Sequence, residues 1–194
     1  MNSMPILIEK TAISDLYIIT NHIFKDERGC IIKYFEKELY KENGLPTEFY
    51  ESIEMISKKG VLRGLHFQTN PSQGRLIHVV AGTIFNVAID LRTGSDTFGK
   101  YECIYLDRDK SIFIPEDFAN GYLTIEENTI VTCQFTNRCV AENSIGIIWN
   151  DSGLNIPWPL ENLDGQLTIS EKDKVLQSFN QYRESVPTSV YIKA

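Results

Sequence analysis

The sequence predicts a single all-β domain, a sandwich or barrel with short peripheral helices. Short runs rich in β-branched and aromatic residues recur through the middle of the chain, separated by turn residues such as Gly82, Gly94–Ser95 and Pro115–Glu116. No stretch carries a sustained helical stripe of apolar residues. With 194 residues, 42% of them hydrophobic, and no internal repeat, the chain can bury one core. We therefore treat residues 1–194 as one domain.

The expected elements follow from these runs and their boundaries. A first short helix is expected over Glu36–Glu42. A second is expected over Ser170–Phe179, where Ser170 can cap the helix and Asp173 supplies an acid at the third position. The expected strands are Cys30–Phe35, Val61–Phe67, Leu76–Val80, Ile84–Asp90, Tyr101–Leu106, Ser111–Ile114, Gly121–Ile125, Ile130–Thr136 and Ile145–Trp149.

Charge and cysteine content narrow the function classes. A net charge of −7 without a basic stripe argues against nucleic-acid binding, although a local basic pocket could still hold an anionic small molecule. The four cysteines form no CxxC pair, so we expect reduced thiols in a cytoplasmic protein. Neither a signal peptide nor a membrane-spanning stretch is expected, because no apolar run is long enough.

The three histidines are the first candidates for proton-transfer chemistry. His22 lies in a polar stretch and is expected at the surface. His78, in the apolar run RLIHVV, is expected to be a hydrogen-bonded, half-buried histidine. His66 lies in VLRGLHFQ, close to a glycine and an arginine, where a catalytic and a structural role are equally compatible with the spacing.

Three arginines each lie next to a glycine and could bind a diphosphate: Arg28, Arg63 and Arg75. For any one of them, a surface charge is the alternative. Strict strand alternation places Arg63 and His66 on opposite faces, unless a bulge at Gly64 redirects one of them. A metal site is not expected, because His66 is followed by Phe67 and Gln68 rather than by further ligands.

Five blocks, read together, resemble the dTDP-4-dehydrorhamnose 3,5-epimerase family: FKDERG (24–29), GVLRGLHFQ (60–68), QGRLIHVVAGTIFNVAIDLRTGSDTFGK (73–100), IPEDFANGYL (114–123) and IIWNDSGLNIPWP (147–159). The similarity covers about residues 5–180 and leaves 181–194 as a C-terminal extension. It implies a cupin-type β-jelly-roll, a homodimer, a nucleotide-diphosphate sugar as substrate and no metal or other cofactor. In such enzymes a base removes a proton from C5 or C3, next to the C4 ketone, and an acid on the opposite face reprotonates the enolate.

The resemblance also assigns roles to single residues. The catalytic base falls on His66, and the carboxylate that pairs with it falls on Asp173 in ISEKD. Arg63 matches an arginine beside the sugar and phosphates, and Arg75 stands where the family has an enolate-stabilising lysine. Two further positions, Phe24 and Arg28, match residues that hold the nucleotide.

The chain departs from the family in its acid. The family's acid tyrosine falls on Cys133, a second site tyrosine on Cys139, and the histidine of the motif GFAHGF on Asn120. The Cys133 thiol could donate a proton, or Cys133 could be a buried apolar residue without a chemical role. Water is a third source of the returning proton.

The positions expected to read the base differ as well. Glu51 falls where the family has a glutamine that faces thymine, and Lys33 falls where it has a glutamate. A carboxylate can accept a hydrogen bond from the exocyclic amine of cytosine, so Glu51 suggests a CDP-linked substrate, epimerised at C5 only.

The sequence thus predicts an epimerase of a nucleotide-linked 4-keto-6-deoxyhexose that inverts C5, C3 or both through an enolate. The alternatives are a 3,4-ketoisomerase on the same scaffold and a non-catalytic sugar-nucleotide binding protein.

Overall fold

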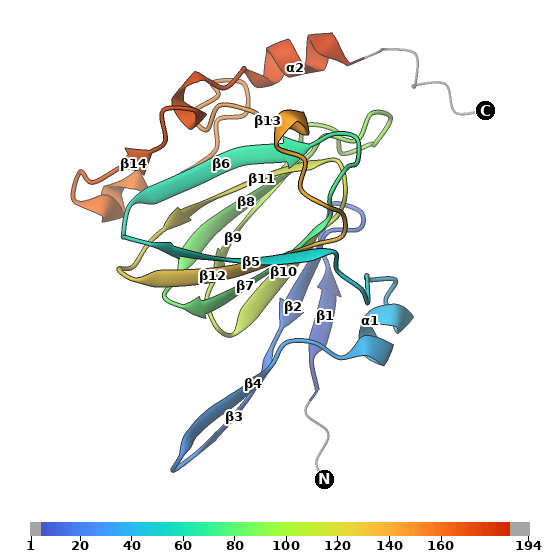
Figure 1. Cartoon of the computed structure of the whole chain (residues 1–194). Coiled ribbons are helices and arrows are strands. Elements are labelled where there is room, and N and C mark those ends of the chain that lie inside the picture. Colours follow the sequence, from blue (N-terminus) through green and yellow to red (C-terminus); the bar gives the residue numbers. More distant parts are fainter. Residues whose placement is uncertain (1–4, 187–194) are drawn as a thin grey trace.

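The computed structural model describes residues 5–186, which form two facing β-sheets with a projecting hairpin (Figure 1). The first sheet has the order β1-β2-β10-β7-β12-β5, and the second has the order β13-β6-β11-β8-β9, with β14 paired to β6. All of these pairs are antiparallel except β14 with β6. This is the expected all-β jelly-roll architecture.

The strands of the first sheet are β1 (Leu7–Lys10), β2 (Tyr17–Thr20), β10 (Lys110–Ile114), β7 (Arg75–Ala81), β12 (Thr129–Phe135) and β5 (Glu51–Ser57). Those of the second are β13 (Ser144–Gly146), β6 (Val61–Gln68), β11 (Phe118–Thr124), β8 (Ile84–Asp90), β9 (Tyr101–Leu106) and β14 (Thr168–Ile169). The projecting hairpin consists of β3 (His22–Asp26) and β4 (Gly29–Lys33). The helices are α1 (Lys37–Glu42) and α2 (Phe179–Ser185), with 3₁₀ turns η1 (Ala141–Asn143), η2 (Leu160–Leu163) and η3 (Asp173–Val175).

Apolar side chains fill three layers around these sheets. The inner cluster lies between the sheets and includes Ile77, Val131 and Ile84. The outer face of the first sheet is covered by the segment around α1, through Tyr40 and its neighbours. The outer face of the second sheet is covered by the C-terminal segment, in which Trp158 packs edge-on against the Phe85 ring. Both sheets are therefore packed on their outer faces as well as against each other.

Most of the expected elements are confirmed, with shifted ends. Ile84–Asp90 and Tyr101–Leu106 coincide with β8 and β9, and the first expected helix is α1. The strand expected over Ile145–Trp149 is shorter, since β13 ends at Gly146. The strands β1, β2, β3 and β5 and the two-residue β14 were not expected. Of the expected extension 181–194, residues 187–194 lie outside the described residues.

The helix expected over Ser170–Phe179 is wrong. Ser170 does cap the turn, because its hydroxyl accepts the Asp173 backbone N–H at 3.2 Å. The turn stops after η3, however, because the chain becomes extended at Leu176 and the Gln177 carbonyl accepts the Ile148 N–H at 2.8 Å. A new helix, α2, then begins after Ser178, which forms a capping box with Gln181.

His78 is buried rather than half-buried. It lies on the outer face of the first sheet, and its Nδ1 is 2.6 Å from the Ser111 hydroxyl. Burial lowers the pKa of His78 to about 4, so the ring is neutral at physiological pH. His78 is thus a structural residue on the side of the sheet away from the cavity.

Candidate active site

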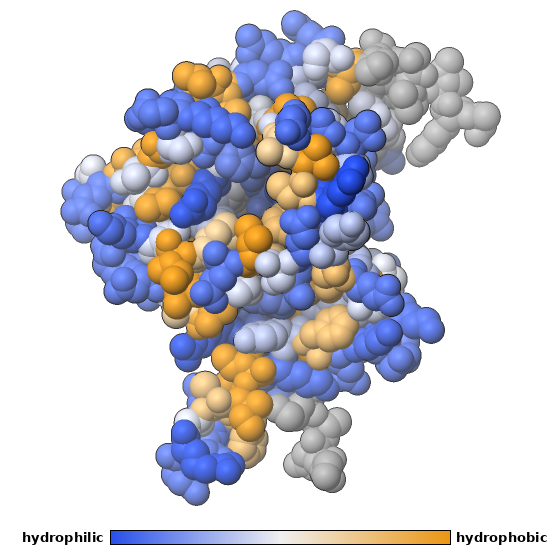
Figure 2. Space-filling view, in the orientation of Figure 1, coloured by the Kyte–Doolittle hydropathy of each residue, from blue (hydrophilic) through white to orange (hydrophobic). Residues whose placement is uncertain are grey.

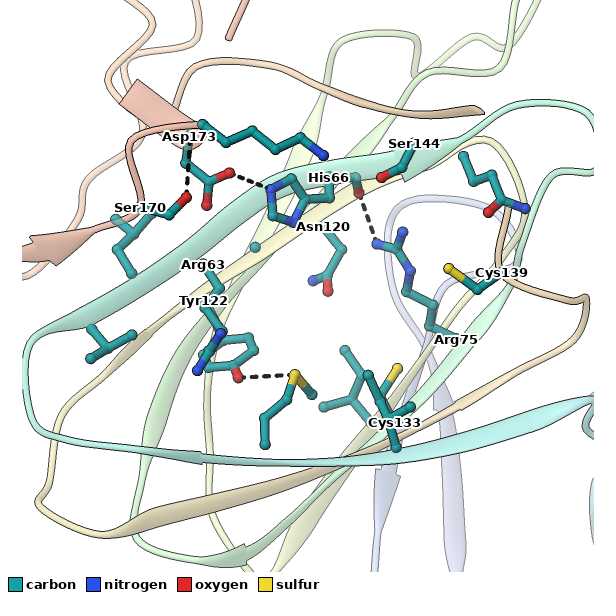
Figure 3. Close-up of a pocket in the computed structure, with 18 of the residues that line it drawn as sticks. Arg63, His66, Arg75, Asn120, Tyr122, Cys133, Cys139, Ser144, Ser170 and Asp173 are labelled. Carbon is teal, nitrogen blue, oxygen red and sulfur yellow. Dashed lines mark hydrogen bonds and ion pairs between the residues drawn. The ribbon is translucent and has the colours of Figure 1, made fainter. Parts of the chain in front are cut away.

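A cavity of about 610 Å³ lies between the two sheets. Its walls come from β5, β6, β7, β11 and β12 and from the segment that ends at Asp173 (Figure 3). The sequence-predicted site residues that line it are Arg63, His66, Arg75, Asn120, Cys133 and Asp173, and Cys139 lines it too. Strands far apart in the sequence thus bring most of the predicted residues to one space.

His66 and Asp173 form a short hydrogen bond in this cavity. Nε2 of His66 lies 2.6 Å from Oδ1 of Asp173. The side chain of Asp173 is 5% exposed and that of His66 is 35% exposed, so the carboxylate is covered while the ring reaches the cavity. Because a carboxylate accepts, Nε2 carries the shared proton, and Nδ1 faces the cavity as the free acceptor (Figure 3). Nδ1 is therefore the atom that can act as a base.

A bulge in β6 places Arg63 and His66 on the same cavity, as the sequence left open. His66 pairs with Asn120 and Arg63 with Tyr122, so β6 has one more residue than β11 between these pairs. Gly64 has a φ of +117°, and a Cβ there would lie 2.5 Å from the Gly121 Cα. Only glycine fits this bulge. Its backbone N–H also points to Oδ2 of Asp173, at 3.4 Å.

Two arginines bring positive charge to opposite sides of the cavity (Figure 3). Arg75 is buried, and its Nη1 donates to the His66 carbonyl at 2.8 Å. Its Nε is buried with no hydrogen-bond partner among residues 5–186. Burial lowers the pKa of Arg75. Arg63 is exposed and donates to the Ser57 hydroxyl through Nε at 3.3 Å and Nη2 at 3.2 Å.

Cys133 lies on the wall formed by β5, β7 and β12, where the neighbouring side chains Ile53, Ile77 and Phe135 are apolar. Burial raises the pKa of the Cys133 thiol to about 12, although the Arg75 charge acts in the opposite direction. The thiol is therefore protonated at neutral pH. Asn120, where the family has histidine, donates to the Asn86 side chain and the Val87 carbonyl, both at 2.9 Å.

Three predicted residues lie outside the lining of the cavity. Phe24 and Arg28 are on the projecting hairpin, where Arg28 pairs with Asp26. Glu51 is on the edge strand β5, and its Oε1 accepts the Cys139 backbone N–H at 2.7 Å. The carboxylate of Glu51 therefore holds the segment that carries Cys139.

Sequence reasoning missed several polar residues of this site, three of which bear on its chemistry. Tyr122 and Lys172 line the cavity, and Ser57 receives the Arg63 hydrogen bonds. Lys172 directly precedes Asp173 in ISEKD, and Tyr122 lies two residues after Asn120 in the block IPEDFANGYL, so their closeness to predicted site residues was the signal.

No cluster of metal-ligating side chains is found within residues 5–186, nor is a helix there long and apolar enough to cross a membrane.

Comparison with known proteins identifies the family. The model of the dTDP-4-dehydrorhamnose 3,5-epimerase family matches residues 10–181. The enzyme of that name from Methanothermobacter thermautotrophicus is 42% identical over 167 residues, which cover 85% of this chain and 90% of the relative. The Shigella flexneri enzyme is 36% identical over 174 residues, covering 88% and 94%.

Solved structures agree with this assignment. The Legionella pneumophila 3,5-epimerase, in complex with dTDP-4-keto-L-rhamnose, has a TM-score of 0.85 at 35% identity and covers 91% of this chain and 94% of its own. The Bacillus anthracis enzyme, with TDP and pyrophosphate bound, has a TM-score of 0.83 at 31% identity and covers 90% and 99%. The chain therefore belongs to the dTDP-4-dehydrorhamnose 3,5-epimerase family.

Proposed function

We propose that this protein epimerises a nucleotide-linked 4-keto-6-deoxyhexose at C3, C5 or both, with His66 as the base. The observation that carries the proposal is the His66–Asp173 pair, 2.6 Å apart, at the wall of a cavity large enough for a sugar. A protein that only binds a sugar nucleotide does not need an oriented imidazole with one free nitrogen.

The first step is removal of a proton next to the ketone. Nδ1 of His66 takes the C3 or C5 proton, the C–H electrons form a C=C bond with C4, and the ketone oxygen becomes an enolate. Asp173 fixes the tautomer and stabilises the imidazolium that forms. Arg75 supports the negative oxygen, because its guanidinium is buried and its Nε has no protein partner among residues 5–186.

We assign the diphosphate to Arg63, Ser57 and Lys172. Arg63 offers a guanidinium that is exposed and positioned by Ser57, and Lys172 adds a second positive charge at the cavity. Guanidinium and ammonium groups are the usual partners of phosphate oxygens. Asn120 contributes a polar side chain to the sugar end of the cavity.

We infer that the nucleotide is dTDP. The relatives are named for a dTDP sugar, and the Bacillus anthracis structure holds TDP. The Glu51 carboxylate, which suggested cytosine, already accepts a backbone N–H and lies outside the cavity lining. Thermal-shift titration tests this inference: dTDP should stabilise the protein more than CDP does, whereas stabilisation by CDP alone would favour the cytosine assignment.

We further propose a homodimer in which each hairpin completes the partner's site. The hairpin β3–β4 pairs with no other strand of the described chain, and such a ribbon is rarely stable alone. Phe24 and Ile31 on it are 49% and 57% exposed, and the edge strand β5 exposes Ile53 and Ile56. Figure 2 shows apolar surface on the projecting hairpin and around the hollow of the same face. A second copy would cover them and bring Phe24 and Arg28 to a nucleotide.

A cytoplasmic location fits the four free thiols.

Exchange of the sugar's C3 and C5 hydrogens with solvent deuterium tests the proposed epimerase function. The protein is incubated with dTDP-4-keto-6-deoxyglucose in deuterated water, and deuterium at C3 and C5 is followed by NMR. Epimerisation is expected to incorporate deuterium at one or both carbons, and His66→Asn should abolish it. Retained exchange in that variant would overturn the assignment of the base. The absence of exchange in the unmodified protein would instead favour a binding protein.

A further inference from the structure

Compared with the family's residue pattern, this cavity lacks one tyrosine and has another at a different position. The family's acid tyrosine falls on Cys133. In the block DFANGYL, which resembles the family's GFAHGF, Tyr122 stands where the family motif has phenylalanine. Both positions line the same cavity. A phenol is therefore still present in the site, but on a different strand.

The Tyr122 side chain crosses the cavity from one sheet to the other. It arises from β11, next to the strand that carries His66. Its hydroxyl donates to Sδ of Met55 at 3.4 Å, and Met55 belongs to β5 in the opposite sheet (Figure 3). Along that sheet Met55 faces Val131 and Ile53 faces Cys133. The phenol thus ends on the wall where the family's acid belongs, away from His66.

The surroundings of this hydroxyl suit a proton donor. A thioether is a weak acceptor, so the proton is free to move to a stronger one. Burial raises the pKa of Tyr122, while the neighbouring Arg63 charge and the Ser57 hydroxyl act in the opposite direction and can stabilise a phenolate. Burial also raises the pKa of the Cys133 thiol, to about 12, and the side chains paired with it across the strands, Ile53 and Ile77, are apolar.

We propose that Tyr122 is the general acid that returns the proton from the face opposite His66. The inference rests on the proposed function. After His66 has taken the proton from one face, the C=C electrons of the enolate take the Tyr122 hydroxyl proton at the same carbon, and the C4 ketone forms again. Tyr122 is left as a phenolate beside Arg63, and His66 as an imidazolium. Proton exchange with water resets both groups.

The test compares Tyr122→Phe with Cys133→Ala, the matched change at the position of the family's acid. Tyr122→Phe installs the residue of the family motif and removes one oxygen atom, so it should fold. In the deuterium experiment, Tyr122→Phe should lower formation of the epimer by about a hundredfold or more, the usual contribution of a general acid. Deuterium should still enter the recovered starting sugar, because His66 can return a solvent deuteron to the face from which it took the proton. Cys133→Ala should lower formation of the epimer much less than Tyr122→Phe does.

Two results would overturn the inference without touching the proposed function. One is unchanged epimer formation by Tyr122→Phe. The other is loss of the epimer in Cys133→Ala with normal turnover in Tyr122→Phe. If Tyr122 only binds or packs, its variant should lose exchange and epimer formation to the same extent, which also contradicts the acid role. If the unmodified protein exchanges no proton, the proposed function itself fails.

Discussion

Replacing Asp173 by Asn tests how much the carboxylate contributes to the base. The Asp173 side chain is 5% exposed and lies 2.6 Å from Nε2 of His66, whose side chain is 35% exposed, so solvent screens the pair in part. When His66 takes a proton, the pair becomes a contact between opposite charges, worth about 4 kcal/mol at ~4 Å and an effective dielectric constant of ~20. A charged hydrogen bond measured by mutation contributes about 1.5 to 3 kcal/mol. Together these values predict a fall in kcat of roughly 10- to 1000-fold.

A change in the His66 tautomer should also lower kcat in this variant. An asparagine can donate its amide N–H to Nε2, which moves the ring proton to Nδ1, the atom that must accept the substrate proton. KM should change much less than kcat, because Asp173 does not reach the sugar through its paired oxygen. The assay is deuterium uptake at C3 and C5 under saturating substrate.

The matched control is Glu171→Gln, which removes a carboxylate two residues away. Its side chain is 89% exposed and pairs with Lys174, so its loss should leave kcat unchanged. Thermal unfolding shows whether each variant is folded. A folded Asp173→Asn enzyme with kcat within about threefold of the unmodified protein would refute the reasoning, since that loss corresponds to less than ~1 kcal/mol.

Three further predictions follow from the fold and the proposed dimer. Gly64→Ala should lower the free energy of unfolding by about 2 kcal/mol or more, because the added Cβ would lie 2.7 Å from the Asn120 backbone oxygen. A loss below about 0.5 kcal/mol in urea unfolding would contradict the bulge geometry. His78 has a pKa of about 4 when folded, below the unfolded value near 6.5, so the unfolded chain binds more protons between these values and stability falls as pH decreases through this window. His78→Gln should remove about 2 to 3 kcal/mol of the stability change between pH 8 and pH 4.5, and an unchanged pH dependence would exclude burial of a neutral ring. Co-expression of the inactive variants Arg28→Ala and His66→Asn should restore about a quarter of the activity if hairpins are exchanged in a dimer, whereas hairpins that serve their own site predict none.

The sequence by itself predicted the fold class and singled out His66 as the candidate for the base. Short alternating apolar runs predict β-strands, because each strand of a sheet buries one face, and most of these runs are strands in the structure. His66, Arg63 and Arg75 lie in matched blocks, and Asp173 lies in the segment ISEKD that was assigned by the same resemblance. The structure brings all four to one cavity. These features depend on local pattern and on residue identity, which a sequence carries directly.

Only the tertiary structure decided how these residues face one another. The bulge at Gly64 depends on the pairing of β6 with β11, which alternation along β6 alone cannot predict. The extended segment at Leu176 depends on pairing of Gln177 with Ile148, which replaced an expected helix. Tyr122 was overlooked because its significance lies across the cavity, where its hydroxyl meets Met55 of the other sheet. Contacts between distant strands follow from packing of the two sheets, and no local pattern encodes them.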